Sequence, residues 1–182
     1  MCPPRVVLDA CVLFPSVLRE ILLNVAAAGG FTPLWSARIL AEWQLAAARK
    51  SPEAAATAQA AIAALRSRWP EAEIPPAPEV ESRLDLPDPA DRHVLATAIA
   101  GGASLILTRN LRDFPARALA PEGLRARAPD DFLIDLWLAD PAFVEPAVQT
   151  AQETTETASN RPQPLRPLLK RAGLPRLGKA LD

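Results

Sequence analysis

The sequence predicts an α/β protein built around a parallel sheet. Residues 5–8 and 103–107 are short runs rich in branched apolar side chains, as in buried strands, and residues 124–128 form a further candidate strand. The segments between these runs carry helical patterns. Strands that alternate with helices indicate a parallel sheet with right-handed crossovers.

The helices after the first strand are expected to begin at three serines that can act as N-caps, Ser16, Ser36 and Ser51. The first of these helices is expected to stop at Gly29-Gly30. The third has Pro52 in its first position and is expected to end at Trp69-Pro70. We interpret residues 75–78 as a loop.

The segment before the second strand has the clearest start signal. Asp88 is a predicted N-cap, Pro89 occupies the first helical position and Asp91 supplies an acid in the first turn. This helix is expected to cover residues 89–100 and to stop at Gly101-Gly102.

The second half of the chain is expected to be mainly helical. Helices are predicted from residue 131 to about residue 158, and the basic tail that follows is predicted to be helical as well. Residues 161–182 hold six Lys or Arg and one acid, together with several leucines that favour a docked appendage over a free arm. We therefore divide the chain into a core at residues 1–133 and a helical C-terminal extension at residues 134–182.

Composition excludes several classes of protein. The formal net charge is −1, so no global basic field indicates a nucleic-acid binder, although a metal cluster can recruit phosphate locally. Cys2 and Cys11 indicate neither a disulfide scaffold nor a zinc site. No apolar run reaches membrane-spanning length and the start lacks a signal-peptide core, so we expect a cytoplasmic protein without a membrane partner.

Acidic and amide side chains gather where the strands are predicted to end. Asp9 ends the first strand, and Asn110 and Asp113 follow the second. Asp91 begins the helix that leads into that strand, which places it at the same edge as Asp9. Glu42 stands on a partly apolar helix face, where a carboxylate requires a partner.

Oxygen ligands without a companion His or Cys suit hard divalent cations. We therefore predict a Mg²⁺ or Mn²⁺ site with the metal ligands Asp9, Glu42, Asp91 and Asp113, and Asn110 as a further catalytic candidate. A metal held in this way would activate a water and neutralise charge on a phosphodiester.

Each candidate residue also has a structural interpretation. Asp9 and Asp88 could be caps, Glu42 could be a solvated helix residue, and Asp91 could interact with the helix dipole. His93 is interpreted as structural or solvent-facing. Four aromatic residues are interpreted as core, namely Phe14, Trp35, Trp43 and Phe114. Only the joint placement of the acids favours a site.

Four segments of the sequence together resemble a known family: VVLDACVLFP, WSARILAEW, LPDPADRHVLATAIAGGASLILTRNLRDFP and PDDFL. They are similar to PIN-domain proteins, and in particular to toxins of the VapC type in the branch with a C-terminal extension. The resemblance covers about residues 6–133, and Gly173 to Pro175 in the tail is also similar to that branch.

The resemblance implies a three-layer α/β/α fold and Mg²⁺- or Mn²⁺-dependent endoribonuclease activity. It further implies neutralisation by a cognate antitoxin and homodimerisation. The metal-binding acids of the family correspond to Asp9, Glu42 and Asp91. The fourth position falls at Asn110, where many relatives carry Asp, so either Asn110 or the nearby Asp113 could complete the site.

Other functions remain open at this point. A PIN-like module could bind RNA or a partner without cutting, and a PIN nuclease could act in RNA processing or on DNA. A haloacid-dehalogenase-type phosphatase would need a second Asp where Cys11 stands. The basic tail could contact phosphate, dock an acidic segment of an antitoxin, or form a solvated face.

Overall fold

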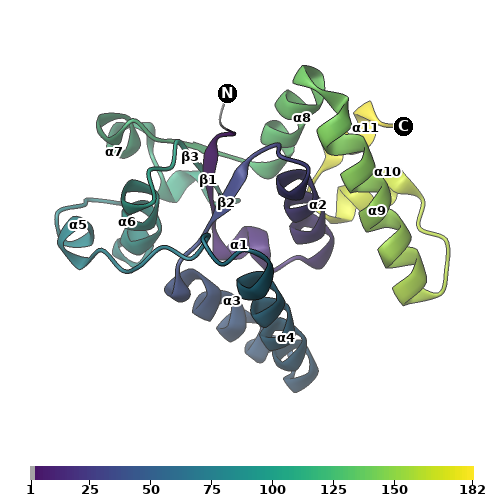
Figure 1. The fold of residues 1–182 in the computed structure, drawn as a ribbon, viewed down its shortest axis with the longest axis horizontal. Coiled ribbons are helices and arrows are strands. Elements are labelled where there is room, and N and C mark those ends of the chain that lie inside the picture. Colours follow the sequence, from purple (N-terminus) through teal and green to yellow (C-terminus); the bar gives the residue numbers. More distant parts are fainter. Residues whose placement is uncertain (1–2) are drawn as a thin grey trace.

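The computed structural model describes residues 3–182, so Cys2 lies outside the described residues. It contains one sheet of four parallel strands in the order β2-β1-β3-β4. The strands are β1 (Arg5–Leu8), β2 (Thr32–Leu34), β3 (Leu105–Leu107) and β4 (Arg125–Arg127). Because all pairings are parallel, the carboxyl ends of the strands meet at one edge of the sheet (Figure 1). The predicted α/β fold with a parallel sheet is confirmed.

Helices cover the sheet and the edge at which its strands end. Figure 1 shows α5 and α6 on one side of the sheet, α2 and α9 on the other, and α3 and α4 beyond the carboxyl ends of the strands. The sheet is the centre of the core, since Val6, Val7 and Leu8 are fully buried. The helices are α1 (Ala10–Leu13), α2 (Ser16–Ala27), α3 (Ala37–Lys50), α4 (Pro52–Arg68), α5 (Pro78–Ser82), α6 (Arg92–Ala100), α7 (Ala116–Leu119), α8 (Pro129–Ala139), α9 (Pro141–Ser159), α10 (Leu165–Arg171) and α11 (Pro175–Ala180).

Two of the three predicted serine caps are present. The Ser36 hydroxyl accepts a hydrogen bond from the N–H of Ile39 at 3.2 Å, and Ser51 accepts one from Ala54 at 3.0 Å. The prediction for Ser16 is wrong, because the N-cap of α2 is Pro15, which makes no side-chain cap. Proline fixes the extended entry to this helix, so Ser16 becomes its first helical residue.

Sequence analysis missed the strand β2 and the helix α5. Pro33 stands in the middle of β2, and proline lowers the expectation of a strand because it cannot donate to a ladder. β2 lies at the edge of the sheet, where that missing N–H is tolerated. The loop predicted at residues 75–78 is wrong at its end, because Pro78 occupies the first position of α5.

The segment around Asp91 forms as predicted, with a tighter first turn. Asp88 accepts a hydrogen bond from the N–H of Ala90 at 2.9 Å. Residues Pro89–Asp91 form a 3₁₀ turn that continues into α6, and the helix ends before Gly101-Gly102. The geometry therefore holds Asp91 at the start of the helix that runs into β3.

The C-terminal tail is helical and docked, as predicted from its leucines. Leu169, Leu174 and Leu177 are fully buried in the common core. The Asp130 carboxylate of α8 accepts hydrogen bonds from the N–H groups of Arg176 and Leu177 at the start of α11. The division at residue 133 falls inside α8 and stays a prediction.

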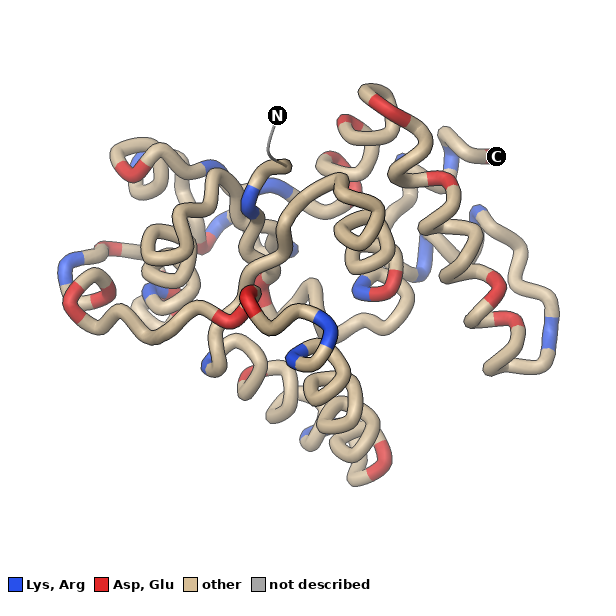
Figure 2. Tube along the Cα trace, in the orientation of Figure 1, with Lys and Arg blue, Asp and Glu red and all other residues tan. Residues whose placement is uncertain are grey.

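Charged residues of both signs are spread along the chain trace (Figure 2). This agrees with the formal net charge of −1. In residues 3–182 no helix combines the length and apolarity needed to cross a membrane.

Candidate active site

Asp9 is held rigidly where β1 ends and α1 begins. It is 6% exposed, and its Oδ1 accepts a hydrogen bond from the N–H of Ala10 at 2.7 Å. Its Oδ2 accepts one from the Thr108 hydroxyl at 2.7 Å and one from the Cys11 thiol at 3.2 Å. Asp9 therefore caps α1, as its structural interpretation expects, while its carboxylate is fixed in one orientation.

Thr108 and Cys11 are functional neighbours that sequence analysis missed. Thr108 is fully buried and follows β3 directly. The sheet register pairs Leu8 with Leu107, so the next residues of the two strands stand side by side. Burial, with a smaller effect from the Asp9 carboxylate, raises the pKa of Cys11 to about 12, so Cys11 is a protonated donor to that carboxylate at neutral pH.

Glu42 of α3 has a partner that sequence analysis did not identify. Its Oε1 lies 2.7 Å from Nε2 of His93, although the two residues are 51 positions apart. The Glu42 side chain is 40% exposed, whereas His93 is 5% exposed. Of the two interpretations of His93, the structural one is correct, and its role is to hold Glu42 in place.

Asp91 lies within electrostatic range of four other carboxylates. Burial raises its pKa to about 6, and the negative charges of Asp9, Asp113, Asp88 and Glu42 add to this effect in that order. Among the described residues, Asp9, Asp91 and Asp113 have no Lys, Arg or His nitrogen within 4.0 Å. The fold thus concentrates negative charge here without a protein cation to balance it.

The loop after β3 separates the roles of Asn110 and Asp113. The backbone N–H of Asn110 donates to the Thr108 hydroxyl at 3.0 Å, and the Asn110 side chain is exposed. Asp113 ends a 3₁₀ turn, Leu111–Asp113, and its charge acts on Asp91. The structure therefore groups Asp113 electrostatically with the other acids.

The donor set fits a hard divalent cation. It consists of carboxylate oxygens that carry unbalanced charge, which is the ligand type that Mg²⁺ and Mn²⁺ prefer. Within residues 3–182 no three acid, His or Cys side chains are close enough, as they stand, to share one ion. Ligation would therefore require movement of the partly buried side chains of Asp91 and Asp113 toward the other acids.

Of the four aromatic residues that were predicted to lie in the core, three do so. Trp35, Trp43 and Phe114 are buried. Phe14 is 37% exposed, so its assignment to the core is wrong. Phe14 is the C-cap of the short helix α1, and this position at a helix end leaves its ring facing solvent.

Residues 5–112, more than half of the chain, match the family described as PIN domain, so the chain belongs to the PIN domain family. Over a stretch of 45 residues the chain is 53% identical to a Mycobacterium tuberculosis protein named "Putative ribonuclease VapC50". This match spans 25% of the chain and 27% of that protein. No solved structure matches the chain significantly.

Proposed function

We propose that the protein is a metal-dependent endoribonuclease in which Asp9, Glu42, Asp91 and Asp113 hold Mg²⁺ or Mn²⁺. One observation carries the proposal: Asp9, Asp91 and Asp113, which have no Lys, Arg or His partner within 4.0 Å, lie near one another, and burial together with the neighbouring negative charges raises the pKa of Asp91 to about 6. A group of this kind is unfavourable unless a cation or a proton balances it.

The residues of the chain prepare the site in two ways. Thr108 and the N–H of Ala10 fix the Asp9 carboxylate, and His93 fixes one oxygen of Glu42. Each carboxylate oxygen has two lone pairs, so both side chains keep acceptor capacity for a further ligand. When bound, a divalent cation supplies Lewis-acid chemistry, which neutralises charge on a phosphodiester and activates water for attack.

RNA as the substrate, and a role as a toxin paired with an antitoxin, belong to the same proposal. They are supported by membership of the PIN domain family and by the local similarity to a protein named as a VapC ribonuclease. We further propose a cognate antitoxin and a homodimer, as the sequence resemblance implies.

Cleavage of a labelled single-stranded RNA tests the mechanism. We expect cleavage with Mg²⁺ or Mn²⁺ and none after addition of EDTA. Asp9→Asn should be folded and inactive, because it removes ligand charge with almost no change of shape. Asp85→Asn, which removes the same charge from a fully exposed side chain, should retain activity.

The outcomes separate the competing functions. Cleavage of comparable rate in EDTA would contradict the metal mechanism. RNA binding without cleavage under every metal condition would favour a non-catalytic module instead, and cleavage of DNA alone would reassign the substrate.

A further inference from the structure

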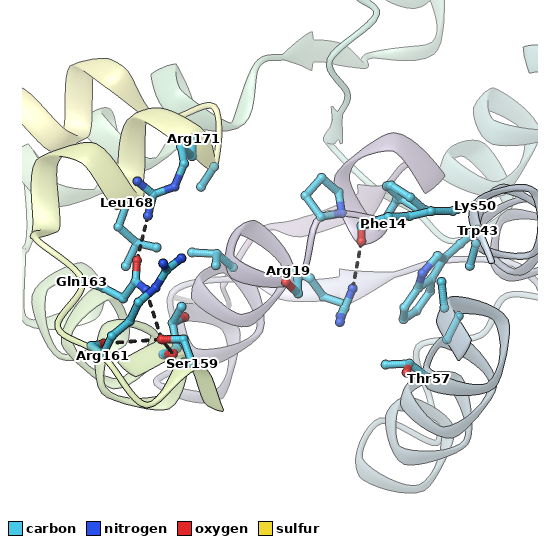
Figure 3. Close-up of a pocket in the computed structure, with 18 residues that line it drawn as sticks. Phe14, Arg19, Trp43, Lys50, Thr57, Ser159, Arg161, Gln163, Leu168 and Arg171 are labelled. Atoms are coloured by element: carbon cyan, nitrogen blue, oxygen red, sulfur yellow. Dashed lines mark hydrogen bonds between the residues drawn. The ribbon is translucent and has the colours of Figure 1, made fainter. Parts of the chain in front are cut away.

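A hollow lies between the PIN core and the C-terminal extension, apart from the acid cluster. It has a volume of about 550 Å³ and lies between α3 and α4 on one side and α9 and α10 on the other. Four cationic side chains from separate parts of the chain line it, namely Arg19, Lys50, Arg161 and Arg171. Figure 3 shows Arg161 and Arg171 on the extension and Lys50 on the opposite side of the hollow, with Arg19 between them, and the side chain of Arg171 is directed toward Gln163.

The positive charge in this basic pocket is not neutralised. Among the described residues no carboxylate lies within 4.0 Å of any of the four cations, and no Asp or Glu lines the pocket. Elsewhere in the structure arginines form ion pairs with acidic residues, as Arg66 does with Glu73. Because the chain as a whole is slightly acidic, four unpaired cations around one hollow indicate an anionic ligand.

Two of the cations are fixed in place and two are free. The Arg19 guanidinium donates to the backbone oxygen of Leu13 at 2.6 Å and lies 4.6 Å from the ring centre of Trp43. Arg171 donates to the side-chain oxygen of the buried Gln163 at 2.8 Å. Lys50 and Arg161 are exposed and make no side-chain hydrogen bond within residues 3–182, so both can reach a ligand.

Two helices, α1 and α3, each carry or border one residue of the acid cluster and one residue that lines the basic pocket. Asp9 caps the start of α1 and Phe14 caps its end, about 8 Å further along the helix axis. Glu42 and Lys50 are eight residues apart on α3, about 12 Å along that axis. A strand of nucleic acid is long enough to occupy both places.

The extension also touches the loop that carries Asn110. A Cβ atom at Gly173 would lie 3.6 Å from the guanidinium of Arg109. Gly173 has φ +82° and turns the chain between α10 and α11. This turn brings the extension against the same loop that borders the acids.

We propose that the basic pocket binds the sugar–phosphate backbone of single-stranded RNA adjacent to the bond that is cut. The proposal rests on the function proposed above and assigns the C-terminal extension a direct role in holding the substrate. Phosphates are bound by the guanidinium and ammonium groups. Phe14 lines the pocket and is 37% exposed, so its ring offers a stacking surface for one base. This combination of unpaired cations with an exposed ring favours RNA over an acidic protein segment, which offers no base to stack.

Binding of a fluorescein-labelled single-stranded RNA of about ten nucleotides, measured by anisotropy in EDTA, tests the proposal without cleavage. The double variant Lys50→Ala/Arg161→Ala should bind about tenfold more weakly near 50 mM salt. The dependence of log affinity on log salt should become shallower by about 1.4, as expected for two lost phosphate contacts on a single strand.

The chain offers a matched control in Arg49→Ala/Lys170→Ala. Each control residue is next to a pocket cation, is exposed and does not line the pocket. The control removes the same charge from α3 and from the C-terminal extension, so it should bind RNA within about twofold of the wild type. Thermal melting of both double variants and of the corresponding single variants checks that all of them are folded.

Two results would overturn the proposal. Equal losses in both double variants would assign the effect to overall charge. Wild-type RNA affinity in the pocket variant would exclude RNA as the occupant, and loss of binding to an acidic protein segment in that variant would then identify a protein ligand. Either result is independent of whether the enzyme cuts RNA with Mg²⁺, so failure of this proposal is distinct from failure of the proposed nuclease activity.

Discussion

Nε2 of His93 lies 2.7 Å from Oε1 of Glu42, which joins α6 to α3 beside the acid cluster. Nδ1 of His93 is buried and has no hydrogen-bond partner among the described residues. An ionised carboxylate oxygen can only accept, so Nε2 carries the hydrogen and donates it to Glu42. The imidazole therefore acts as a fixed donor that holds one oxygen of a proposed metal ligand.

Replacing His93 should weaken metal binding without touching a ligand directly. We expect His93→Ala to lower the affinity for Mn²⁺ by about 10- to 100-fold, because neighbours that orient metal ligands contribute on this scale. Calorimetry with Mn²⁺ and the metal dependence of the cleavage rate measure the effect. His93→Gln keeps an N–H donor and should recover part of the loss. Unchanged metal affinity in His93→Ala would show that Glu42 needs no such support.

Asp91→Asn should stabilise the metal-free protein while it abolishes activity. The pKa of Asp91 is raised from 3.8 to about 6, so the folded chain holds this proton more tightly than the unfolded chain does. The contribution of Asp91 to stability therefore falls as pH rises from about 4 to about 6, and the penalty is complete above that range. Asparagine carries no charge and avoids the penalty.

Thermal unfolding in EDTA at two pH values tests whether Asp91→Asn stabilises the metal-free protein. The melting temperature of Asp91→Asn should exceed that of the wild type near pH 7.5, and the gain should shrink near pH 5. A saturating divalent metal should reverse the order, because only the wild type gains the binding energy of the full ligand set. A lower melting temperature of the variant in EDTA near pH 7.5 would contradict the prediction.

Asp113 and Asn110 should differ in their effect on catalysis. Asp113 adds negative charge at Asp91, whereas Asn110 has an exposed amide side chain. We expect Asp113→Ala to reduce the rate of RNA cleavage more than Asn110→Ala at subsaturating Mg²⁺. An inactive Asn110→Ala beside an unchanged Asp113→Ala would reverse the assignment.

The Thr108 hydroxyl should be required for both stability and orientation of the site. It donates to Asp9 and accepts from the N–H of Asn110, and it is fully buried. Thr108→Val keeps the shape but leaves both partners without this bond, so we expect a loss of about 1–3 kcal/mol in the free energy of unfolding. Urea unfolding measures the loss. Thr108→Ser keeps the hydroxyl and should stay closer to the wild type in both stability and cleavage.

Much of the fold could be predicted from local sequence patterns, such as apolar runs and helix-capping residues. Strand β1 is a short branched apolar run, and the start of the Asp91 helix is marked by Asp88-Pro89. β2 could not be predicted in this way, because its proline is acceptable only at a sheet edge, and edge position is a property of the whole sheet. Local sequence patterns therefore predict that a helix or strand is present better than they predict which other elements lie beside it.

In the candidate site, too, some positions could be predicted from the sequence and the contacts between distant residues could not. The position of Asp9 at a strand end was predictable, since parallel strands end together. The support of Glu42 by His93 was not, because it joins residues 51 positions apart through the packing of α3 beside α6. The convergence of Lys50 and Arg161 across one hollow depends equally on how the extension docks.

The two borders of the sheet limit how copies of this chain can associate. One border, β2, carries Pro33, and the other, β4, carries Arg125 and Arg127. The β2 border is also covered next to Leu34, because Trp35 pairs with Glu73, and prolines and like charges at edge strands disfavour intermolecular pairing. Self-association by adding strands is therefore disfavoured. We therefore expect a second copy to approach through helical surfaces, which would leave the sheet at four strands.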